Sequence, residues 1–249
     1  MKRILILVIV TLLLIPLSVK AQSDKPSIQA NLGIRGRWQT GNLNQLGLIP
    51  NAAILLQSEN ISLKINSSYQ YLLVENFNPV NDFWTFSVLK WQTKRKIHPI
   101  IGANFGFAKS YKIKQSYSYG MGYEARLYEK SDKEYLYTGL LVGYMNFQFE
   151  HANSHTGAHM GLLLSSAIPV SDKIFMTIGL KSYHSLKEID FWGGSSQIML
   201  NYQFKKNLSL NISQDIVFNN QNEPGIKQLN TLMLFGVRYY LFANHKQSK

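Results

Sequence analysis

Residues 27–39 read SIQANLGIRGRWQ, and their side chains alternate in character from one position to the next. The even positions carry apolar or small side chains, namely Ile28, Ala30, Leu32, Ile34, Gly36 and Trp38. The odd positions carry polar side chains or glycine, namely Gln29, Asn31, Gly33, Arg35, Arg37 and Gln39. Because successive side chains of a strand point to opposite faces, this stretch predicts a β-strand with one apolar and one polar face.

The same alternation recurs along most of the chain, as in SYSYGMGYEARLY (116–128) and FWGGSSQIMLNYQF (191–204). It predicts twelve strands, with ten or fourteen remaining open. The expected strands are residues 27–39, 45–57, 61–74, 83–91, 97–111, 116–128, 134–148, 157–168, 174–185, 190–204, 208–218 and 230–242. Most exceed the average soluble strand of about 5–6 residues. They suit a tilted membrane-spanning strand, which needs about 9–11 residues.

Alternation by itself does not decide which face meets water, because a soluble barrel encloses its apolar face and a membrane barrel presents it to lipid. The polar face here is rich in glycine, as a crowded lumen would be (Gly33, Gly102, Gly106, Gly120 and Gly122). Connections also alternate in length. Segments such as ENFNPVND (75–82) and EHANSHTG (150–157) alternate with short ones such as SEN (58–60) and VSDK (170–173). Long outer loops and short periplasmic turns are typical of outer-membrane barrels.

Aromatic side chains gather near the ends of the expected strands, where membrane barrels carry two aromatic girdles. If the N-terminus starts in the periplasm, the outer ends carry Trp38, Tyr71, Trp84, Tyr111, Tyr117, Tyr183 and Trp192. The inner ends carry Trp91, Tyr128, Tyr135, Phe175, Phe204 and Phe242. The sequence therefore predicts an all-β, transmembrane, antiparallel up-and-down β-barrel with both termini in the periplasm.

The first 22 residues, MKRILILVIVTLLLIPLSVKAQ, have a basic tip, a short apolar run and small residues before Gln22. The run is too short to span a bilayer, which takes about 20 residues, so we expect a signal peptide cleaved near Ala21/Gln22. Residues 22–249 then form a single barrel domain in the outer membrane of a Gram-negative cell. The chain has no cysteine, which excludes disulfides and thiolate metal sites.

The net charge of +12 falls by three, to +9, when Lys2, Arg3 and Lys20 leave with the signal peptide. A basic exported protein is not expected to meet nucleic acid. Anionic outer-membrane lipids and lipopolysaccharide are the partners that its charge favours, with solubility as the simpler explanation. Lys109, Lys112 and Lys114 lie near the expected outer surface, where they would face lipopolysaccharide phosphates.

The first hairpin contains Gly36-x-Trp38-x-Thr40-Gly41-Asn42-x-Asn44 after an alternating strand. This pattern resembles the opening of the salt-induced outer-membrane protein family, the YdiY-like family of unknown function. The later hairpins, over about residues 27–242, are compatible with it. The resemblance implies a porin-like outer-membrane barrel and brings no catalytic residue or substrate. The last strand, with Gly236 followed by spaced aromatic and apolar residues, resembles the signal read by barrel-assembly machinery during insertion.

The pairing of the first two strands follows from their faces. A two-residue turn at Gly41-Asn42 would place lipid-facing Trp38 opposite Gln45, whereas a loop of odd length places it opposite Leu46. Slipping by one residue would turn arginines to lipid at about 2–4 kcal/mol each near mid-bilayer. We therefore predict a loop of three or five residues, with Gly41 or Asn42 in a left-handed conformation.

Several histidine, serine and glutamate side chains are candidates for chemistry. His151, His155 and His159 have i, i+4, i+8 spacing, but they lie in an expected loop, so a solvated loop is favoured over a metal site. His184, Ser185 and Glu188 form the most enzyme-like cluster. His184 and Ser185 are adjacent and should face opposite ways, which disfavours a catalytic pair. No phosphate-binding loop or His-Glu zinc motif occurs, and we expect no cofactor.

The remaining functional signal is charge on the inward face, carried by Arg35, Arg37, Lys64, Glu124, Arg126 and Lys181. Such charges set ion preference or bind an anionic solute, or else they form a satisfied network that plugs a narrow barrel. The sequence thus favours a non-enzymatic outer-membrane barrel, structural or a passive small-solute pore. The alternatives are an outer-membrane hydrolase of lipid A or phospholipid and a secreted soluble β-barrel that binds a small apolar ligand.

Overall fold

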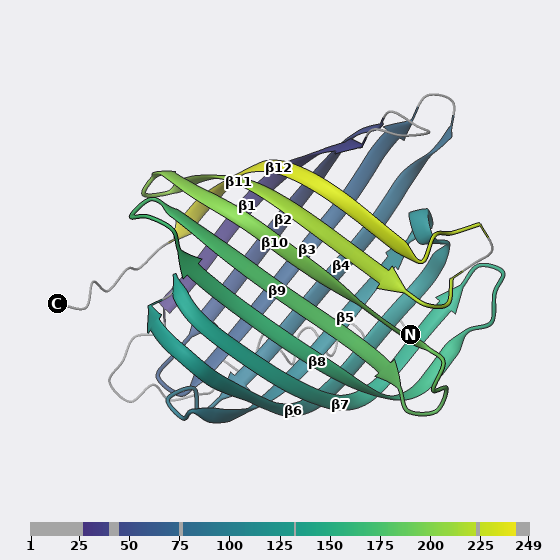
Figure 1. Ribbon diagram of the computed structural model, residues 1–249, viewed down its shortest axis with the longest axis horizontal. Helices are drawn as coiled ribbons and strands as arrows, with labels where there is room; N and C mark the ends of the chain where they lie inside the picture. Colours follow the sequence, from purple (N-terminus) through teal and green to yellow (C-terminus); the bar gives the residue numbers. More distant parts are fainter. Residues whose placement is uncertain (1–26, 40–44, 75–76, 132, 223–224, 243–249) are drawn as a thin grey trace.

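The computed structural model describes residues 27–39, 45–74, 77–131, 133–222 and 225–242. Twelve antiparallel strands close into one barrel in which each strand pairs with its sequence neighbours and β1 pairs with β12 (Figure 1). The strands are β1 Ser27–Gln39, β2 Gln45–Gln57, β3 Ile61–Val74, β4 Phe77–Trp91, β5 Ile97–Ala108, β6 Ile113–Ser131, β7 Glu134–Phe149, β8 His155–Pro169, β9 Ile174–Ser185, β10 Trp192–Lys205, β11 Leu208–Asn219 and β12 Leu229–Phe242. The predicted fold class and strand number are confirmed.

The barrel presents its apolar side chains outward. On β1 the exposed residues are the even ones, such as Ile34 at 58%, while Gly33 and Arg35 are buried on the inner face. On β6 the exposed ones include Tyr119, Met121 and Tyr123. A membrane barrel shows such a surface to lipid, and a soluble barrel would enclose it. Among the described residues no helix combines the length and apolarity needed to cross a bilayer.

The register of the first hairpin agrees with the predicted one. Trp38 pairs with Leu46, Arg37 with Gly47, and Gln39 with Gln45. Five residues, 40–44, separate the two strands, which is one of the two predicted loop lengths. The conformations of Gly41 and Asn42 and the side chain of Trp38 fall outside the described residues.

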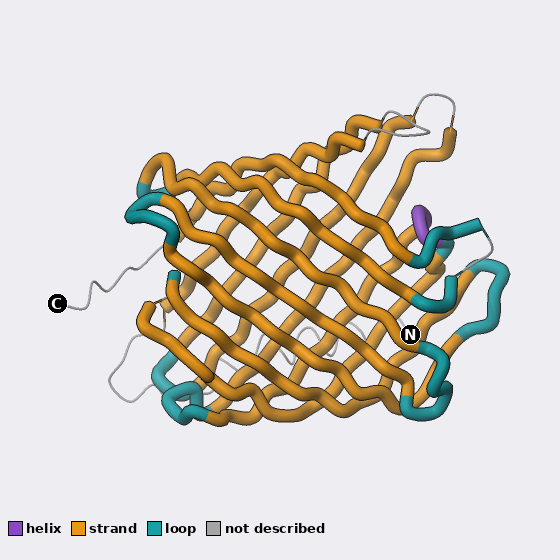
Figure 2. Tube along the Cα trace, viewed as in Figure 1, coloured by secondary structure: helices purple, strands orange, loops and turns teal. Residues whose placement is uncertain are grey.

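The two ends of the barrel differ in their connections (Figures 1 and 2). At one end lie the connections that lead from an odd-numbered strand to the next even-numbered one, such as β1 to β2. This end, here called the long-loop end, has connections of up to nine residues (220–228). The opposite, short-turn end carries connections of five residues or fewer. Which end faces the periplasm stays a prediction.

Two expected segments are built differently. The expected long loop ENFNPVND (75–82) is largely strand, because pairing between β3 and β4 continues to Val74 and Phe77. The expected strand 97–111 ends at Ala108 and continues as a 3₁₀ turn, η1 Lys109–Tyr111. The backbone N–H and hydroxyl of Ser110 both donate to the carboxylate of Asp82 on β4, which stabilises this turn.

The aromatic girdles are only partly as predicted. The residues on the outer face are Tyr71, Trp91, Tyr117, Tyr128, Trp192 and Phe204. The residues that instead pack inside the barrel or against its interior are Trp84, Tyr111, Tyr135, Phe175 and Tyr183. Phe242 has no described side chain. The reason is that strands such as β4 and β7 are apolar on both faces, so their pattern does not identify the inner one.

The barrel interior holds two apolar clusters. An aromatic cluster inside the barrel, near the long-loop end, is built from Ala108, Ile113, Met145, Phe147, Phe149 and Phe191, with Trp84, Tyr111, Ala152 and Tyr183 packed against it. A mid-lumen apolar cluster is built from Val88, Ile100 and Leu141, with Phe86 and Leu163 packed against it. Inward glycines make room for these side chains, since a Cβ on Gly106 would lie 2.3 Å from the Trp84 ring. The lumen is therefore partly filled on the side formed by β4 to β9.

Candidate functional site

The middle of the lumen carries more positive than negative charge. Basic side chains come from five strands: Arg35 on β1, Lys64 on β3, Lys90 on β4, Lys181 on β9 and Arg238 on β12. In the described strands they face two acidic side chains in this region, Glu124 on β6 and Asp215 on β11. Each lies on the inward face because its strand turns apolar neighbours toward lipid. We treat this set as the candidate functional site.

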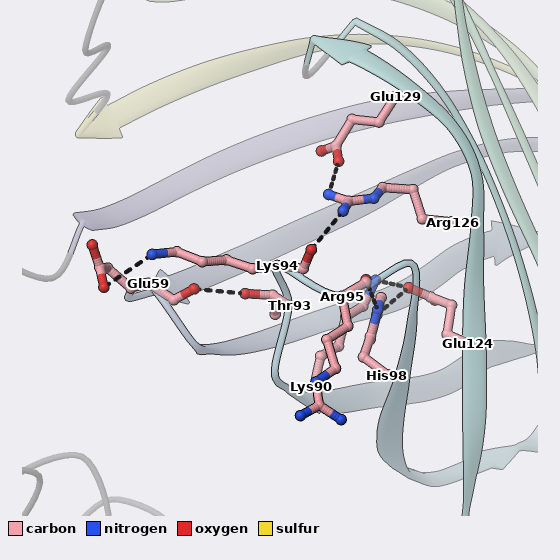
Figure 3. Close-up of polar contacts among 9 residues, drawn as sticks. All are labelled: Glu59, Lys90, Thr93, Lys94, Arg95, His98, Glu124, Arg126 and Glu129. Atoms are coloured by element: carbon pink, nitrogen blue, oxygen red, sulfur yellow. Dashed lines mark hydrogen bonds and ion pairs between the residues drawn. The ribbon is translucent and has the colours of Figure 1, made fainter.

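Glu124 is the acidic centre of the short-turn side of the lumen (Figure 3). Its Oε1 lies 2.5 Å from Lys90 Nζ and 3.1 Å from His98 Nε2. Glu124 is only 5% exposed. Lys90 also lies over the ring of Tyr137, 4.9 Å from its centroid. A buried carboxylate with two such partners has its charge compensated locally, so it subtracts little from the positive field of the other bases.

Asp215 plays the corresponding role on the opposite side. Arg35 Nη1 lies 3.4 Å from its Oδ2, and Gln197 Nε2 donates to its Oδ1 at 2.9 Å. The aliphatic stem of Arg35 lies over Gly236, where a Cβ would come within 2.6 Å of Arg35 Cγ. Arg238 is close enough to Arg35 for the two positive charges to interact. Asp215 is the ion-pair partner of Arg35, whereas Arg238 Nη2 contacts Met199 Sδ at 3.6 Å.

Lys64 and Lys181 are the two lumen bases exposed to solvent. In the described part of the chain neither forms an ion pair with a carboxylate. Their ammonium groups lie near enough to interact, and the charge of Lys64 also interacts with those of Lys90, Arg238 and, attractively, Glu124. Uncompensated bases that water can reach attract anions into the lumen.

Open space adjoins these lysines. A Cβ placed on Gly179, on the lumen face of β9, would meet nothing within 4 Å. Ser195, which pairs with Lys181, is also exposed although it faces inward. The lumen wall formed by β9 and β10 is therefore open beside Lys181.

Further charges mark the two ends. At the short-turn end Arg126 donates to Glu129 at 2.6 Å and to the carbonyl oxygen of Lys94 at 2.8 Å (Figure 3). At the long-loop end Arg37 lies within electrostatic reach of Asp82 and Tyr111. Burial, and then the Asp82 charge, raises the pKa of Tyr111 to about 12, against a smaller lowering by Arg37.

The other sequence candidates do not converge on one site. His155 and His159 lie on β8 and are buried, and His155 Nδ1 contacts Glu188 Oε2 while its ring stacks on Phe191. Ser185 is buried and accepts a hydrogen bond from the Glu188 backbone N–H. His151 lies outside the strands, in the connection before β8.

His184 pairs with Trp192 and Met160 on the outer face, whereas Ser185 faces inward. The structure therefore brings Glu188 to His155 rather than to His184. Within the described ranges no group of three His, Cys, Asp or Glu residues is arranged to hold a metal ion.

Three lumen residues escaped the sequence reasoning: Lys90, Asp215 and Arg238. Lys90 lies on the same strand face as Val88, Asp215 on that of Ser213, and Arg238 on that of Gly236. The two-residue period of each strand places all three on the inner face. On β4 and β12 this period is obscured by apolar residues on both faces, whereas β11 alternates clearly up to Asp215.

The closed antiparallel barrel, its apolar outer surface and its charged lumen define an outer-membrane β-barrel. Solved structures with a similar fold are the following. The NanC porin has 11% sequence identity and a TM-score of 0.55, over 84% of this chain and 98% of that chain. An outer-membrane channel from Pseudomonas putida F1 has 8% identity and a TM-score of 0.49, over 90% and 98%. The KdgM porin in complex with oligogalacturonate has 11% and 0.47, over 84% and 98%.

The chain belongs to the family described as "Protein of unknown function, DUF481", which matches residues 89–240. This confirms the family resemblance, although the match lies outside the first hairpin that suggested it. No curated protein matches the sequence.

Proposed function

We propose that this protein is a passive outer-membrane pore that favours small anionic solutes. The observation that carries the proposal is the imbalance of lumen charge: Arg35, Lys64, Lys90, Lys181 and Arg238 against Glu124 and Asp215. Rings of one sign of charge set the ion preference of a pore. The pore carries out no catalytic step, and it reaches the outer membrane after removal of residues 1–21.

The two uncompensated lysines dominate the preference. Glu124 and Asp215 form ion pairs with Lys90 and Arg35, which leaves Lys64 and Lys181, together with the less exposed Arg238, to act on a passing ion. An anion about 4 Å from an ammonium group in water gains about 1 kcal/mol, which is about fivefold in occupancy. The effect should weaken at high salt, where the Debye length falls to about 3 Å at 1 M.

The test is conductance of the purified full-length protein in planar bilayers under a KCl gradient. We expect discrete conductance steps and a reversal potential of the sign given by chloride preference. The Lys64→Gln and Lys181→Gln variants should each lower the chloride-to-potassium permeability ratio, by up to about fivefold.

Lys173→Gln is the matched control, because Lys173 is exposed in a short turn outside the lumen. It should leave the permeability ratio unchanged. Insertion without conductance steps, or a preference for potassium, would overturn the proposal and leave a closed or cation-selective barrel.

A further inference from the structure

The mid-lumen apolar cluster is out of place in a water-filled pore, whose interior is ordinarily polar. Val88, Ile100 and Leu141 are buried in it, and Phe86 and Leu163 are partly buried against them. All five project from the inner side of β4, β5, β7 and β8. The lumen wall on this side therefore offers an apolar and partly aromatic surface.

The two uncompensated lysines border this surface on both sides. Lys64 on β3 pairs in register with Val88, and Lys181 on β9 pairs in register with Leu163. Lys181 reaches across the lumen, and its Nζ lies 3.4 Å from the ring centroid of Phe86. Cationic groups and an apolar face thus meet at one point of the lumen.

The site has room for a guest. Beside Lys181, Gly179 leaves space in which a Cβ would touch nothing within 4 Å, and Ser195 is exposed to the lumen. Among the described residues, the ammonium group of Lys181 makes its direct contact with the ring of Phe86. An anionic group would bind this ammonium more strongly than an aromatic face does.

Resting on the pore function above, we infer that the mid-lumen binds small aromatic carboxylates. The carboxylate lies between Lys64 and Lys181, and the aromatic body lies against Phe86 and the mid-lumen apolar cluster. Hydroxylated anions such as sugar acids fit less well, because the apolar wall leaves their hydroxyl groups without hydrogen-bond partners. The pore therefore selects among anions by the apolar surface they carry.

The experiment compares benzoate with gluconate, a hydroxylated monoanion, as blockers of the chloride current in planar bilayers. We expect benzoate to reduce the current in a saturable way, because a bound anion occupies the route. Gluconate should reduce it only in proportion to its share of the anions. Equal behaviour of the two anions would overturn the inference.

Two variants assign the block to this site. Phe86→Ala should weaken benzoate block about threefold to tenfold by removing the aromatic contact, and Lys181→Gln should weaken it about tenfold or more. Phe105→Ala is the matched control and should leave the block unchanged, since Phe105 lies on the lipid face of β5, paired with Tyr117 and next to Phe83. Unaltered block in both lumen variants would place benzoate elsewhere.

The two proposals fail in different ways. A conducting, chloride-preferring barrel that treats benzoate and gluconate alike contradicts only the aromatic site. A barrel without conductance contradicts the pore. In that case equilibrium dialysis of the detergent-solubilised protein against labelled benzoate tests the site. We expect saturable binding that Lys181→Gln weakens. The absence of saturable binding would overturn the inference. Heat-modifiable migration on a denaturing gel shows that each variant is folded.

Discussion

Lys90 Nζ lies 2.5 Å from Glu124 Oε1, and this ion pair joins β4 to β6 across the inner face of β5. His98 of β5 contacts the same carboxylate oxygen at 3.1 Å. The three strands are therefore tied together on the lumen side by one acidic residue, in addition to their backbone ladders. The pair lies on the short-turn side of the lumen, near the rim contacts of Arg126 (Figure 3).

Replacing Glu124 with glutamine should lower stability and raise anion preference together. The variant leaves Lys90 without its counter-ion, and breaking a buried pair costs about 3–5 kcal/mol. Because Lys90 is partly open to lumen water, we expect about 1–3 kcal/mol. Urea titration of the heat-modifiable gel shift measures the stability, and the reversal potential measures the selectivity.

Glu129→Gln is the control for this change. Glu129 pairs with Arg126 at the rim, where both side chains are about one-third exposed (29% and 34%). Its loss should cost less than about 1 kcal/mol, as for other surface pairs. Equal effects of the two substitutions would contradict the structural role assigned to Glu124.

Gly122→Ala should prevent normal barrel formation, whereas Gly179→Ala should be tolerated. Both glycines lie on the lumen face. A Cβ on Gly122 would lie 1.8 Å from the backbone oxygen of Leu140, while one on Gly179 would meet nothing within 4 Å. A steric clash with backbone atoms, which cannot move aside as a flexible side chain would, costs about 1–3 kcal/mol or more. The yield of heat-modifiable protein checks both, and a fully folded Gly122→Ala variant would contradict the close packing of β6 against β7.

Ile34→Lys should impair insertion into the membrane. Ile34 lies near the middle of β1 with its side chain on the outer surface, where a lysine costs about 2–4 kcal/mol at mid-bilayer. Ser195→Lys, on the lumen face of β10, should cost less than about 1 kcal/mol because water reaches it. Urea-dependent folding into phospholipid vesicles measures both, and similar costs would refute the assignment of faces.

Alkaline pH should loosen the β5–β6 connection through Tyr111. Because burial raises the pKa of this phenol to about 12, the folded state holds the proton more tightly than the unfolded chain does. The stabilisation is complete below pH 10 and declines as pH rises from about 10 to about 12. Proteolysis in the η1 region should increase over this range, and less so in Tyr111→Phe. An identical pH profile in that variant would exclude Tyr111 as the group responsible.

The first hairpin shows how far the sequence reaches. On β1 the apolar residues lie on one face only, so the side of Arg35 and Arg37 and the pairing of Trp38 with Leu46 follow from keeping charge out of lipid. On β4 the pattern does not identify Trp84 as an inward residue. Phe83, Trp84 and Phe86 place aromatic rings on both faces, and no pattern distinguishes the lipid side from the lumen side.

The candidate site was predicted in part for the same reason. The bases Arg35, Lys64 and Lys181 were recognised because their apolar neighbours alternate clearly, whereas Arg238 was hidden in the apolar last strand. The two apolar clusters inside the barrel were not predicted. Inward apolar residues look like lipid-facing ones in the sequence, because both surfaces exclude charge.

By itself the sequence determined the strands, the apolar face and the register of the first hairpin, since each depends on a two-residue period and on the cost of charge in lipid. Only the tertiary structure decided which inward side chains meet. Arg35 reaches Asp215 across 180 residues of sequence, and Lys181 reaches Phe86 across the lumen. Such contacts depend on barrel closure and strand stagger, which set distances between strands that are far apart in the chain.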